Sequence, residues 1–372
     1  MPFGVAMRTM IHASGEAPSG PGPGLFAWGA NGSGQLGKAD VVSRSSPVQV
    51  GALTTWTSVT GGRYKNLALK SDGTLWSWGY AAHGQLGLGD TTPRSYPVQV
   101  GTLTTWTSIV DGCFHSLAIK SDGTLWAWGS SSNGQLGLGD VVSRNSPVQV
   151  GTLTTWMAIT EGRDNSLAIQ SDGTLWAWGA GSYGKLGLGN VLNRSSPVQV
   201  GALTTWTAIA FGYQHTIALQ SNGTLWAWGK GANGRLGLGD TADRSSPVQV
   251  GTLTTWTSVA GTLNHSFALK SDGTLWALGG YNGDGNLGLG DAIARSSPVQ
   301  VGTLTTWTAI ARGSNTHTIA LQSNGTLWAW GANGSGQLGK ADVVSRSSPV
   351  QVGTLTTWTS VGGGWNHTLA LN

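Results

Sequence analysis

Short apolar segments alternate with runs of glycine, serine, asparagine and aspartate along most of the chain, and the same pattern returns at a fixed period. The segment PVQV begins seven times, at spacings of 50 or 51 residues: Pro47, Pro97, Pro147, Pro197, Pro247, Pro298 and Pro349. A second segment, LWAWG or a close variant, recurs in step with it from Leu25, Leu75, Leu125, Leu175, Leu225, Leu275 and Leu327. Such self-similarity is typical of repeat architectures, in which each copy is one supersecondary unit.

Each copy holds four candidate strands, with sequences close to PVQV, WTSV, LALK and TLWAWG. They are rich in β-branched, aromatic and aliphatic residues, and no helix-length periodic run lies between them. Ser-Asp-Gly or Ser-Asn-Gly separates the third from the fourth, as at Asp122-Gly123. This spacing predicts a β-hairpin, and we expect a type I′ turn with positive φ at both central residues.

Both faces of these strands carry apolar or small residues, as shown by Trp126 and Trp128 on one face and Leu125 and Ala127 on the other. Strands buried on both faces need neighbours above and below them. Four-stranded units stacked around an axis meet this need. We therefore predict an all-β fold, a seven-bladed β-propeller of four-stranded antiparallel blades over residues 25–372.

The two ends of the chain predict how the ring closes. The repeats start at Leu25 on the second strand of the hairpin and stop at Leu369–Leu371 on its first strand, so that only the turn between them is missing. We expect these two strands to pair and to complete one blade. Residues 1–24, with a Gly- and Pro-rich run from Ser14 to Gly24, are expected to be a flexible leader.

Composition narrows the functional class. Charged residues make up only 10% of the chain, and the net charge of +4 is scattered, so the clustered basic surface of a nucleic-acid binder is missing. The single cysteine, Cys113, excludes an intramolecular disulfide and a multi-cysteine metal site. No export signal and no run of 18 apolar residues is recognisable, which favours a soluble protein, cytoplasmic or virion-associated.

Three recurring patterns resemble chemical motifs. The run G-S-G-Q-L-G from Gly32 matches a dinucleotide fingerprint, but no helix pattern follows it, so no cofactor is predicted. Histidine occupies one position in five copies, and we expect it to brace loop backbone rather than to bind metal. These histidines are His115, His215, His265, His317 and His367, with Lys65 and Asn165 at the same position in the other two copies.

An Arg precedes each PVQV strand and follows an Asp by four residues in six of the seven copies, which predicts six ion pairs bracing the connecting loop. The pairs are Asp40 with Arg44, Asp90 with Arg94, Asp140 with Arg144, Asp240 with Arg244, Asp291 with Arg295 and Asp342 with Arg346; Arg194 has Asn190 instead. No catalytic triad, zinc motif or phosphate loop is visible, so the sequence does not predict an enzyme.

The stretch from Gly112 to Asp140, which reads H-S-L-A-I-K-S-D-G-T-L-W-A-W-G followed by N-G-Q-L-G-L-G-D, resembles the regulator of chromosome condensation repeat. The resemblance covers residues 25–372 and implies a seven-bladed propeller. The founding activity of that family is nucleotide exchange on a small nuclear GTPase, together with chromatin binding. Members with that activity carry an inserted wedge and a basic N-terminal tail, whereas here no copy gains more than two residues and Arg8 is the only Lys or Arg among residues 1–24.

Comparison of the copies locates a candidate binding face. The segments after WTSV and after LWAWG vary, whereas GTLTTW and SDGT barely change. In an antiparallel meander the two variable segments emerge on one rim, and the residues they gain include types that dominate interaction hot spots. The candidate partner-binding residues are Arg63, Tyr64, Lys65, Tyr80, His83, Phe114, His115, Arg163, Asp164, Tyr183, Tyr213, Gln214, Asn264, Tyr281, Asn315 and Trp365.

Three hypotheses of function follow. The first is an interaction or display propeller that binds a protein, or with less support a glycan, through this rim. The second is a regulator of a small GTPase or an inhibitor of an enzyme. The third is a structural component of a larger assembly such as a phage or virus particle, docked through residues 1–24.

Overall fold

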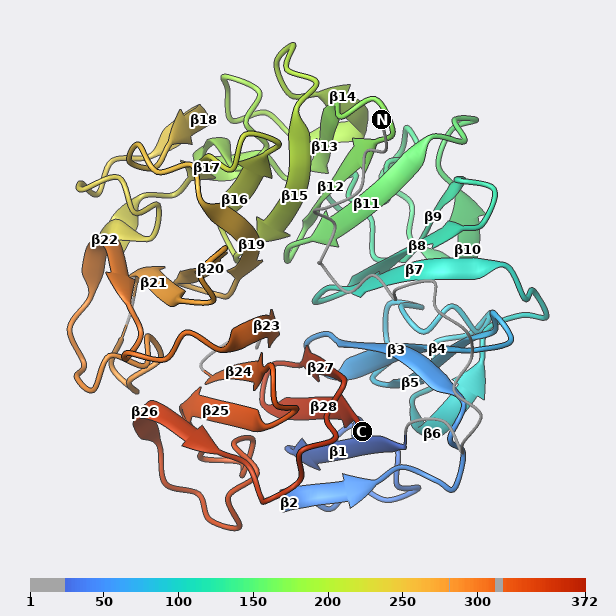
Figure 1. Ribbon diagram of the computed structural model, residues 1–372. Helices are drawn as coiled ribbons and strands as arrows, with labels where there is room; N and C mark the ends of the chain where they lie inside the picture. Colours follow the sequence, from blue (N-terminus) through green and yellow to red (C-terminus); the bar gives the residue numbers. More distant parts are fainter. Residues whose placement is uncertain (1–23, 281, 312–316) are drawn as a thin grey trace, which may run out of the picture.

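The computed structural model describes residues 24–280, 282–311 and 317–372. Within them, 28 strands form seven four-stranded antiparallel sheets that stand radially around one axis (Figure 1). The predicted seven-bladed propeller is confirmed.

From the axis outward, blade 1 contains β3 (Trp56–Gly61), β4 (Lys65–Lys70), β5 (Leu75–Gly79) and β6 (Arg94–Gln99); blade 2 contains β7 (Trp106–Asp111), β8 (His115–Lys120), β9 (Leu125–Gly129) and β10 (Arg144–Gln149). Blade 3 contains β11 (Trp156–Glu161), β12 (Asn165–Gln170), β13 (Leu175–Gly179) and β14 (Arg194–Gln199); blade 4 contains β15 (Trp206–Phe211), β16 (His215–Gln220), β17 (Leu225–Gly229) and β18 (Arg244–Gln249). Blade 5 contains β19 (Trp256–Gly261), β20 (Ser266–Lys270), β21 (Leu275–Gly279) and β22 (Arg295–Gln300); blade 6 contains β23 (Trp307–Ala311), β24 (His317–Gln322), β25 (Leu327–Gly331) and β26 (Arg346–Gln351).

Blade 7 is built from both ends of the chain, in the order β27 (Ser360–Gly363), β28 (His367–Leu371), β1 (Leu25–Gly29) and β2 (Arg44–Gln49). The strands β1 and β28 pair in antiparallel register from Leu25 opposite Leu371 to Gly29 opposite His367. Figure 1 shows the two strands side by side. The predicted closure of the ring is therefore confirmed.

Each blade begins at the WTSV-type strand next to the axis and ends at the PVQV segment on the outside. The outer strand starts earlier than PVQV, at Arg44 in β2, and its pairing with the neighbouring strand is interrupted by an irregularity. Proline cannot donate to a sheet, and an edge strand is where a sheet tolerates it. Pro47 and its equivalents thus occupy the one strand that suits them.

The hairpin between the second and third strands of a blade is confirmed, but the predicted turn type is wrong. Only Gly123 in the Ser121–Gly123 turn has a positive φ, of 75°. The Gly123 amide donates to the carbonyl of Lys120 (2.9 Å), which closes a type I turn followed by a left-handed glycine. A three-residue connection of this kind needs positive φ only at the glycine, so Asp122 and its equivalents stay in ordinary backbone conformations.

The hydrophobic core lies between blades rather than in one central cluster. In the joint of blades 1 and 2, Leu67 and Leu75 of one blade pack against Trp106 and Trp128 of the next. Hydrogen bonds follow the same joint: the indole Nε1 of Trp128 and the hydroxyl of Ser116 both donate to the Gln85 carbonyl (3.0 Å each). The indole bond recurs for Trp28, Trp78, Trp178, Trp228 and Trp330, whereas blade 5 has Leu278 in this position.

The connecting loops carry the six predicted ion pairs. Arg144 Nη2 lies 2.6 Å from Asp140 Oδ2, and the other five Asp and Arg pairs repeat the contact. The Val142 amide and then Arg144 lower the pKa of the Asp140 carboxyl. These pairs are partly exposed and recur in six of the seven blades, so they stiffen the loops and do not mark a unique site.

Helices are minor elements in the described part of the chain. The two that occur, η1 (Ser182–Gly184) and η2 (Ala232–Gly234), have three residues each, and neither is long or apolar enough to cross a membrane.

Candidate partner-binding rim

Backbone hydrogen bonds place the two variable segments of each copy on one face of the ring. In blade 1 the Tyr80 amide, just after β5, donates to the carbonyl of Tyr64, just before β4 (2.9 Å). The near-constant segments meet on the opposite face, where the Trp106 amide donates to the Gly73 carbonyl (3.2 Å). The expectation of one shared face is confirmed. We call it the variable rim: residues 62–64, 112–114, 162–164, 212–214, 262–264 and 364–366 near the axis, and 80–84, 130–134, 180–184, 230–234 and 282–284 further out.

Most of the candidate residues have side chains that reach the surface of this rim. His83 and Tyr183 are exposed, and the half-buried candidates are Arg63, Tyr64, Tyr80, Phe114, Arg163, Asp164, Tyr213, Gln214, Asn264 and Trp365. Tyr281 and Asn315 lie outside the described residues.

Arg63 lies at the centre of an aromatic group contributed by three blades. Its guanidinium carbon is 3.7 Å from the ring centroid of Trp365 in blade 7, and 5.2 Å from the centroids of Tyr64 in blade 1 and Phe114 in blade 2. We call these four residues the Arg63 cage. Its rings continue outward through Tyr80 and His83, with neighbouring centroids 5.2 to 6.4 Å apart.

The Arg63 side chain makes no hydrogen bond or ion pair with the residues that the structure describes, and its Nε is buried without a partner. A guanidinium has five N–H donors, and a buried donor without an acceptor costs free energy. The ring faces offset part of this cost through cation–π attraction. The donors at the edge of the guanidinium remain available.

Arg163, at the same position of the third copy, has different surroundings. Its Nε lies 3.3 Å from Asp164 Oδ2, and its Nη1 donates to the hydroxyl of Tyr213 in the next blade. The neighbouring blades add further cations, since Lys230 lies over the Tyr183 ring at 4.5 Å. Burial and Arg163 lower the pKa of Lys185, which Asp164 partly raises, to about 8.

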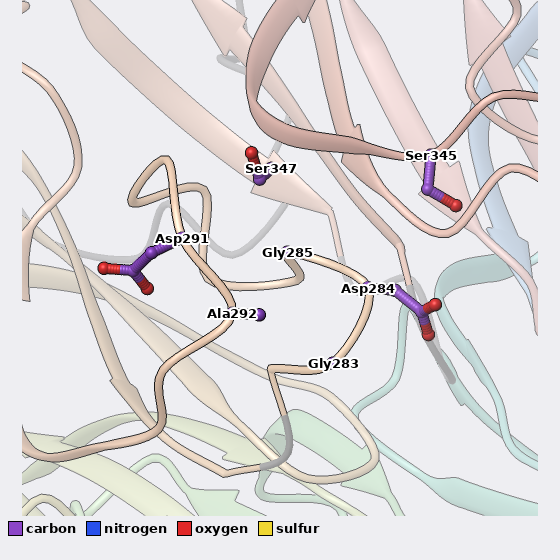
Figure 2. A pocket seen from close by; sticks show the side chains of 7 residues that line it. All are labelled: Gly283, Asp284, Gly285, Asp291, Ala292, Ser345 and Ser347. Atoms are coloured by element: carbon purple, nitrogen blue, oxygen red, sulfur yellow. The ribbon is translucent and has the colours of Figure 1, made fainter.

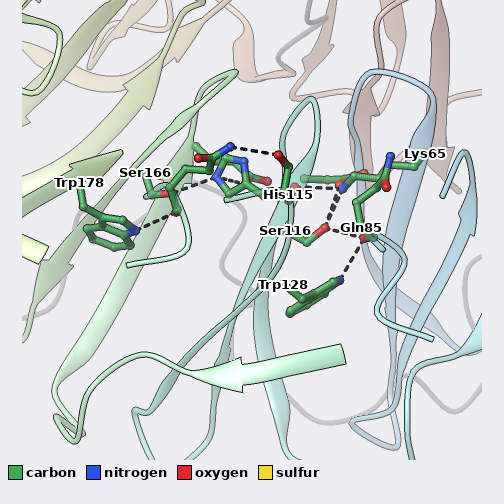
Figure 3. A network of polar contacts seen from close by, with 11 residues as sticks. Lys65, Gln85, His115, Ser116, Trp128, Ser166 and Trp178 are labelled. Atoms are coloured by element: carbon green, nitrogen blue, oxygen red, sulfur yellow. Dashed lines mark hydrogen bonds and ion pairs between the residues drawn. The ribbon is translucent and has the colours of Figure 1, made fainter. Parts of the chain in front are cut away.

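Lys65 and His115 were candidates for partner contact, and that part of the prediction is wrong because both side chains are fully buried. Figure 3 shows them in a network that crosses from blade 1 to blade 3. Lys65 Nζ pairs with Asp111 and donates to the Ser116 hydroxyl (2.6 Å), while His115 Nε2 lies 2.9 Å from Glu161 Oε2. A buried lysine such as Lys65 needs a paired acid and hydrogen bonds of this kind.

The sequence analysis missed Asp111 and Glu161, which end the innermost strands β7 and β11. A signal was present, because the other copies have glycine, phenylalanine or arginine at this position. The two acids occur directly after the copies that carry Lys65 and His115. Lys65 and Asp111 both differ from the residues of most other copies, so these two positions changed together across the joint of blades 1 and 2.

Four of the five histidines at the common position (the histidine column), His115, His215, His317 and His367, join blades through side chains rather than bracing loop backbone, which corrects the expectation. His115, His215 and His317 place Nε2 2.8 to 3.0 Å from the hydroxyl of a serine or threonine in the next blade. His367 Nε2 lies 2.7 Å from Asn66 Oδ1. Since the Asn66 amide donates to the Gln35 carbonyl, its oxygen is free to accept, and His367 carries its proton on Nε2. Among the described residues, no group of three His, Cys, Asp or Glu side chains converges as a metal site requires.

A shallow hollow of about 350 Å³ lies where the outer loops of blades 5 and 6 meet (Figure 2). Its charged lining residues are Asp284 and Asp291, and Asp291 is bound by Arg295. Ser345 and Ser347 complete its polar lining. No base lies within hydrogen-bond reach of a nucleophile here in the described structure, so the hollow does not have the arrangement of a catalytic site.

Comparison with known proteins agrees with this geometry. The sequence profile of the Regulator of chromosome condensation (RCC1) repeat matches seven times, at residues 24–69, 72–119, 122–169, 172–219, 222–269, 272–321 and 324–371. The chain belongs to the RCC1 repeat family. A second RCC1 repeat profile matches residues 206–235 and 307–337.

Solved RCC1 propellers have the same fold. Prp20p from Saccharomyces cerevisiae has a TM-score of 0.85 and 22% identity over 95% of this chain and 92% of that one. The yeast protein bound to Kap60 gives 0.84 and 22% over 94% and 88%, and human WBSCR16 gives 0.83 and 22% over 94% and 98%. At this identity the likeness establishes the fold of this RCC1 propeller and not its partner.

Proposed function

We propose that this RCC1 propeller is a non-enzymatic interaction protein that binds a protein partner through the variable rim. The observation that carries the proposal is the Arg63 cage with its extension through Tyr80 and His83. Arginine, tyrosine and tryptophan dominate hot spots of protein interfaces. Here they form one continuous surface contributed by blades 7, 1 and 2.

Proteins of similar fold support the proposal. Prp20p has binding properties toward Gsp1p and histones, and yeast RCC1 has been solved in complex with Kap60. The present chain lacks a long insertion in any blade, and this favours a role other than nucleotide exchange. A regulator of an enzyme and a docked component of a larger assembly are the alternatives that the experiment must separate.

The test is quantitative cross-linking in the native host with three versions of the full chain. The first is the wild type, the second combines Arg63→Gln, Tyr64→Ala and Trp365→Ala, and the third combines Leu103→Ser and Leu153→Ser on the opposite face, where both leucines are exposed. We expect one set of cross-linked proteins to disappear from the rim variant alone. Loss from the third version alone would refute the proposal.

Two further measurements address the alternatives. Removal of residues 1–24 would abolish incorporation into a particle if the chain were a docked structural component. Faster release of labelled GDP from a captured small GTPase would identify an exchange regulator. The interaction proposal predicts neither effect.

A further inference from the structure

Arg63 and Arg163 occupy the same position of two copies, yet only one of them is neutralised. Arg163 has a carboxylate and a phenol as partners within the protein. Arg63 has three aromatic rings and no acidic partner among the described residues. The N–H donors and the positive charge of a partly desolvated guanidinium of this kind are fully satisfied only when an anion binds to it.

The geometry leaves one direction open for that anion. Trp365 covers a face of the guanidinium, and Tyr64 and Phe114 flank it. Cation–π contacts use the face of the guanidinium, whereas its N–H donors point outward in its plane. A carboxylate can therefore bind the edge, in bidentate fashion, without displacing the rings.

We infer that Arg63 receives an aspartate or glutamate side chain of the protein partner, with the aromatic rings excluding water from the pair. The inference rests on the proposed function and specifies the chemistry of that same surface.

The distribution of cations favours a carboxylate over a phosphate of nucleic acid. Lys65, the cation nearest in sequence to Arg63, is buried and paired with Asp111. Arg163, Lys185 and Lys230 belong to blades 3 and 4. A phosphate backbone is bound by several cations along its path, whereas the Arg63 cage offers one planar guanidinium with apolar walls. Such a site suits one acidic side chain flanked by apolar residues.

The experiment uses a random 12-residue peptide library displayed on phage and selected on the immobilised full-length protein. Selected peptides are synthesised and measured by fluorescence anisotropy against the wild type, Arg63→Gln, Trp365→Ala and the matched control Arg163→Gln. Near-ultraviolet circular dichroism verifies that each variant is folded. We expect enrichment of Asp or Glu at one peptide position, and a loss of at least about tenfold in affinity when that residue becomes Asn or Gln. Arg63→Gln should cause the same loss of affinity, and combining it with the peptide substitution should cause no further loss. Arg163→Gln should change the affinity by less than about twofold.

Each other outcome has a definite meaning. Peptides that need Trp365 but bind equally well after the acidic substitution would overturn the inference and leave the proposed function standing. Peptides indifferent to both Trp365 and Arg63, or no enrichment over a blank surface, would count against both. A last outcome is that the selected peptides bind without any Asp or Glu, and that phosphotyrosine lowers their affinity as much as an acidic peptide does. That result would assign the site to phosphate and overturn the inference.

Discussion

The guanidinium carbon of Arg63 lies 3.7 Å from the ring centroid of Trp365, so the first complete blade contacts the blade that closes the ring. This contact joins residues from opposite ends of the chain. Because it bridges two blades, it contributes to stability as well as to the surface of the rim.

We expect a double-mutant cycle of Arg63→Ala and Trp365→Ala to give a coupling of about 0.5–1 kcal/mol in the free energy of unfolding, as measured for exposed cation–π pairs. Urea denaturation followed by tryptophan fluorescence measures it. Arg63→Ala combined with Tyr183→Ala is the control and should be additive, because no contact joins these residues. Additivity in the first cycle would contradict the role assigned to the contact.

The buried Lys65 and Asp111 pair gives a sharper test. Lys65→Met leaves Asp111 buried without its cation and should cost about 3–5 kcal/mol of unfolding free energy. The double variant Lys65→His with Asp111→Gly reproduces the joint of blades 4 and 5, where His215 contacts Ser266 and β19 ends in Gly261. We expect it to recover most of the loss in chemical denaturation. Failure to recover would mean that neither residue pattern can be transferred between joints.

The histidine column predicts a loss of stability in mild acid. Burial lowers the pKa of His265 and His367 to about 3 and that of His317 to about 4. Among the described residues their buried Nδ1 atoms have no acceptor, so a second proton finds no partner there. The unfolded chain, with a histidine pKa of about 6.5, then binds protons first, and stability falls as the pH drops below that value.

Each such histidine should contribute a slope of about 1.4 kcal/mol per pH unit between pH 6 and 4.5. His317→Asn introduces the residue that blade 3 has at this position, Asn165. It should lower the pH slope of the unfolding free energy by the contribution of one histidine. Urea midpoints at half-unit intervals of pH measure this effect. His83→Asn, an exposed control, should leave the slope as it is, and an unchanged slope in His317→Asn would show that other groups dominate.

Closure of the ring predicts a global effect of a small deletion. Removal of residues 366–372 eliminates β28, which leaves β27 without a partner strand and β1 paired with β2 alone. Because each blade is covered by its neighbours, we expect faster amide hydrogen exchange in all seven blades, and not in blade 7 alone. The substitution Leu355→Ser, at an exposed site next to blade 7, is the control and should act locally. A purely local increase after the deletion would argue against closure as the source of cooperativity.

Strand number, blade topology and ring closure could all be predicted, because seven copies report the same apolar pattern and the two chain ends are complementary. The turn type could not, since Asp-Gly occurs in more than one hairpin and Asp122 needs no positive φ. The fate of Lys65 and His115 was misjudged for a physical reason. Both begin a strand, and the sequence does not reveal that the side chain there points into the joint between blades.

The Arg63 cage was predicted as a set of residues and not as an arrangement. Variation among copies identifies Arg63, Tyr64, Phe114 and Trp365 as candidates on one face. Which ring lies over the guanidinium depends on side-chain conformations of three separate blades, and no local pattern specifies these. The contrast with Arg163 likewise depends on Asp164 and Tyr213 being oriented toward it.

Asn372 and Gly24 flank the place where the other blades have their Ser-Asp-Gly or Ser-Asn-Gly turn, and the Asn372 amide donates to the Gly24 carbonyl (3.2 Å). A turn of that sequence joining residue 372 to residue 24 would leave every interblade contact in place. The chain could then be opened at the equivalent turn of another blade, which yields a family of circular permutants with one tertiary structure. For this ring, we expect such permutants to keep the same arrangement of blades wherever the chain is opened.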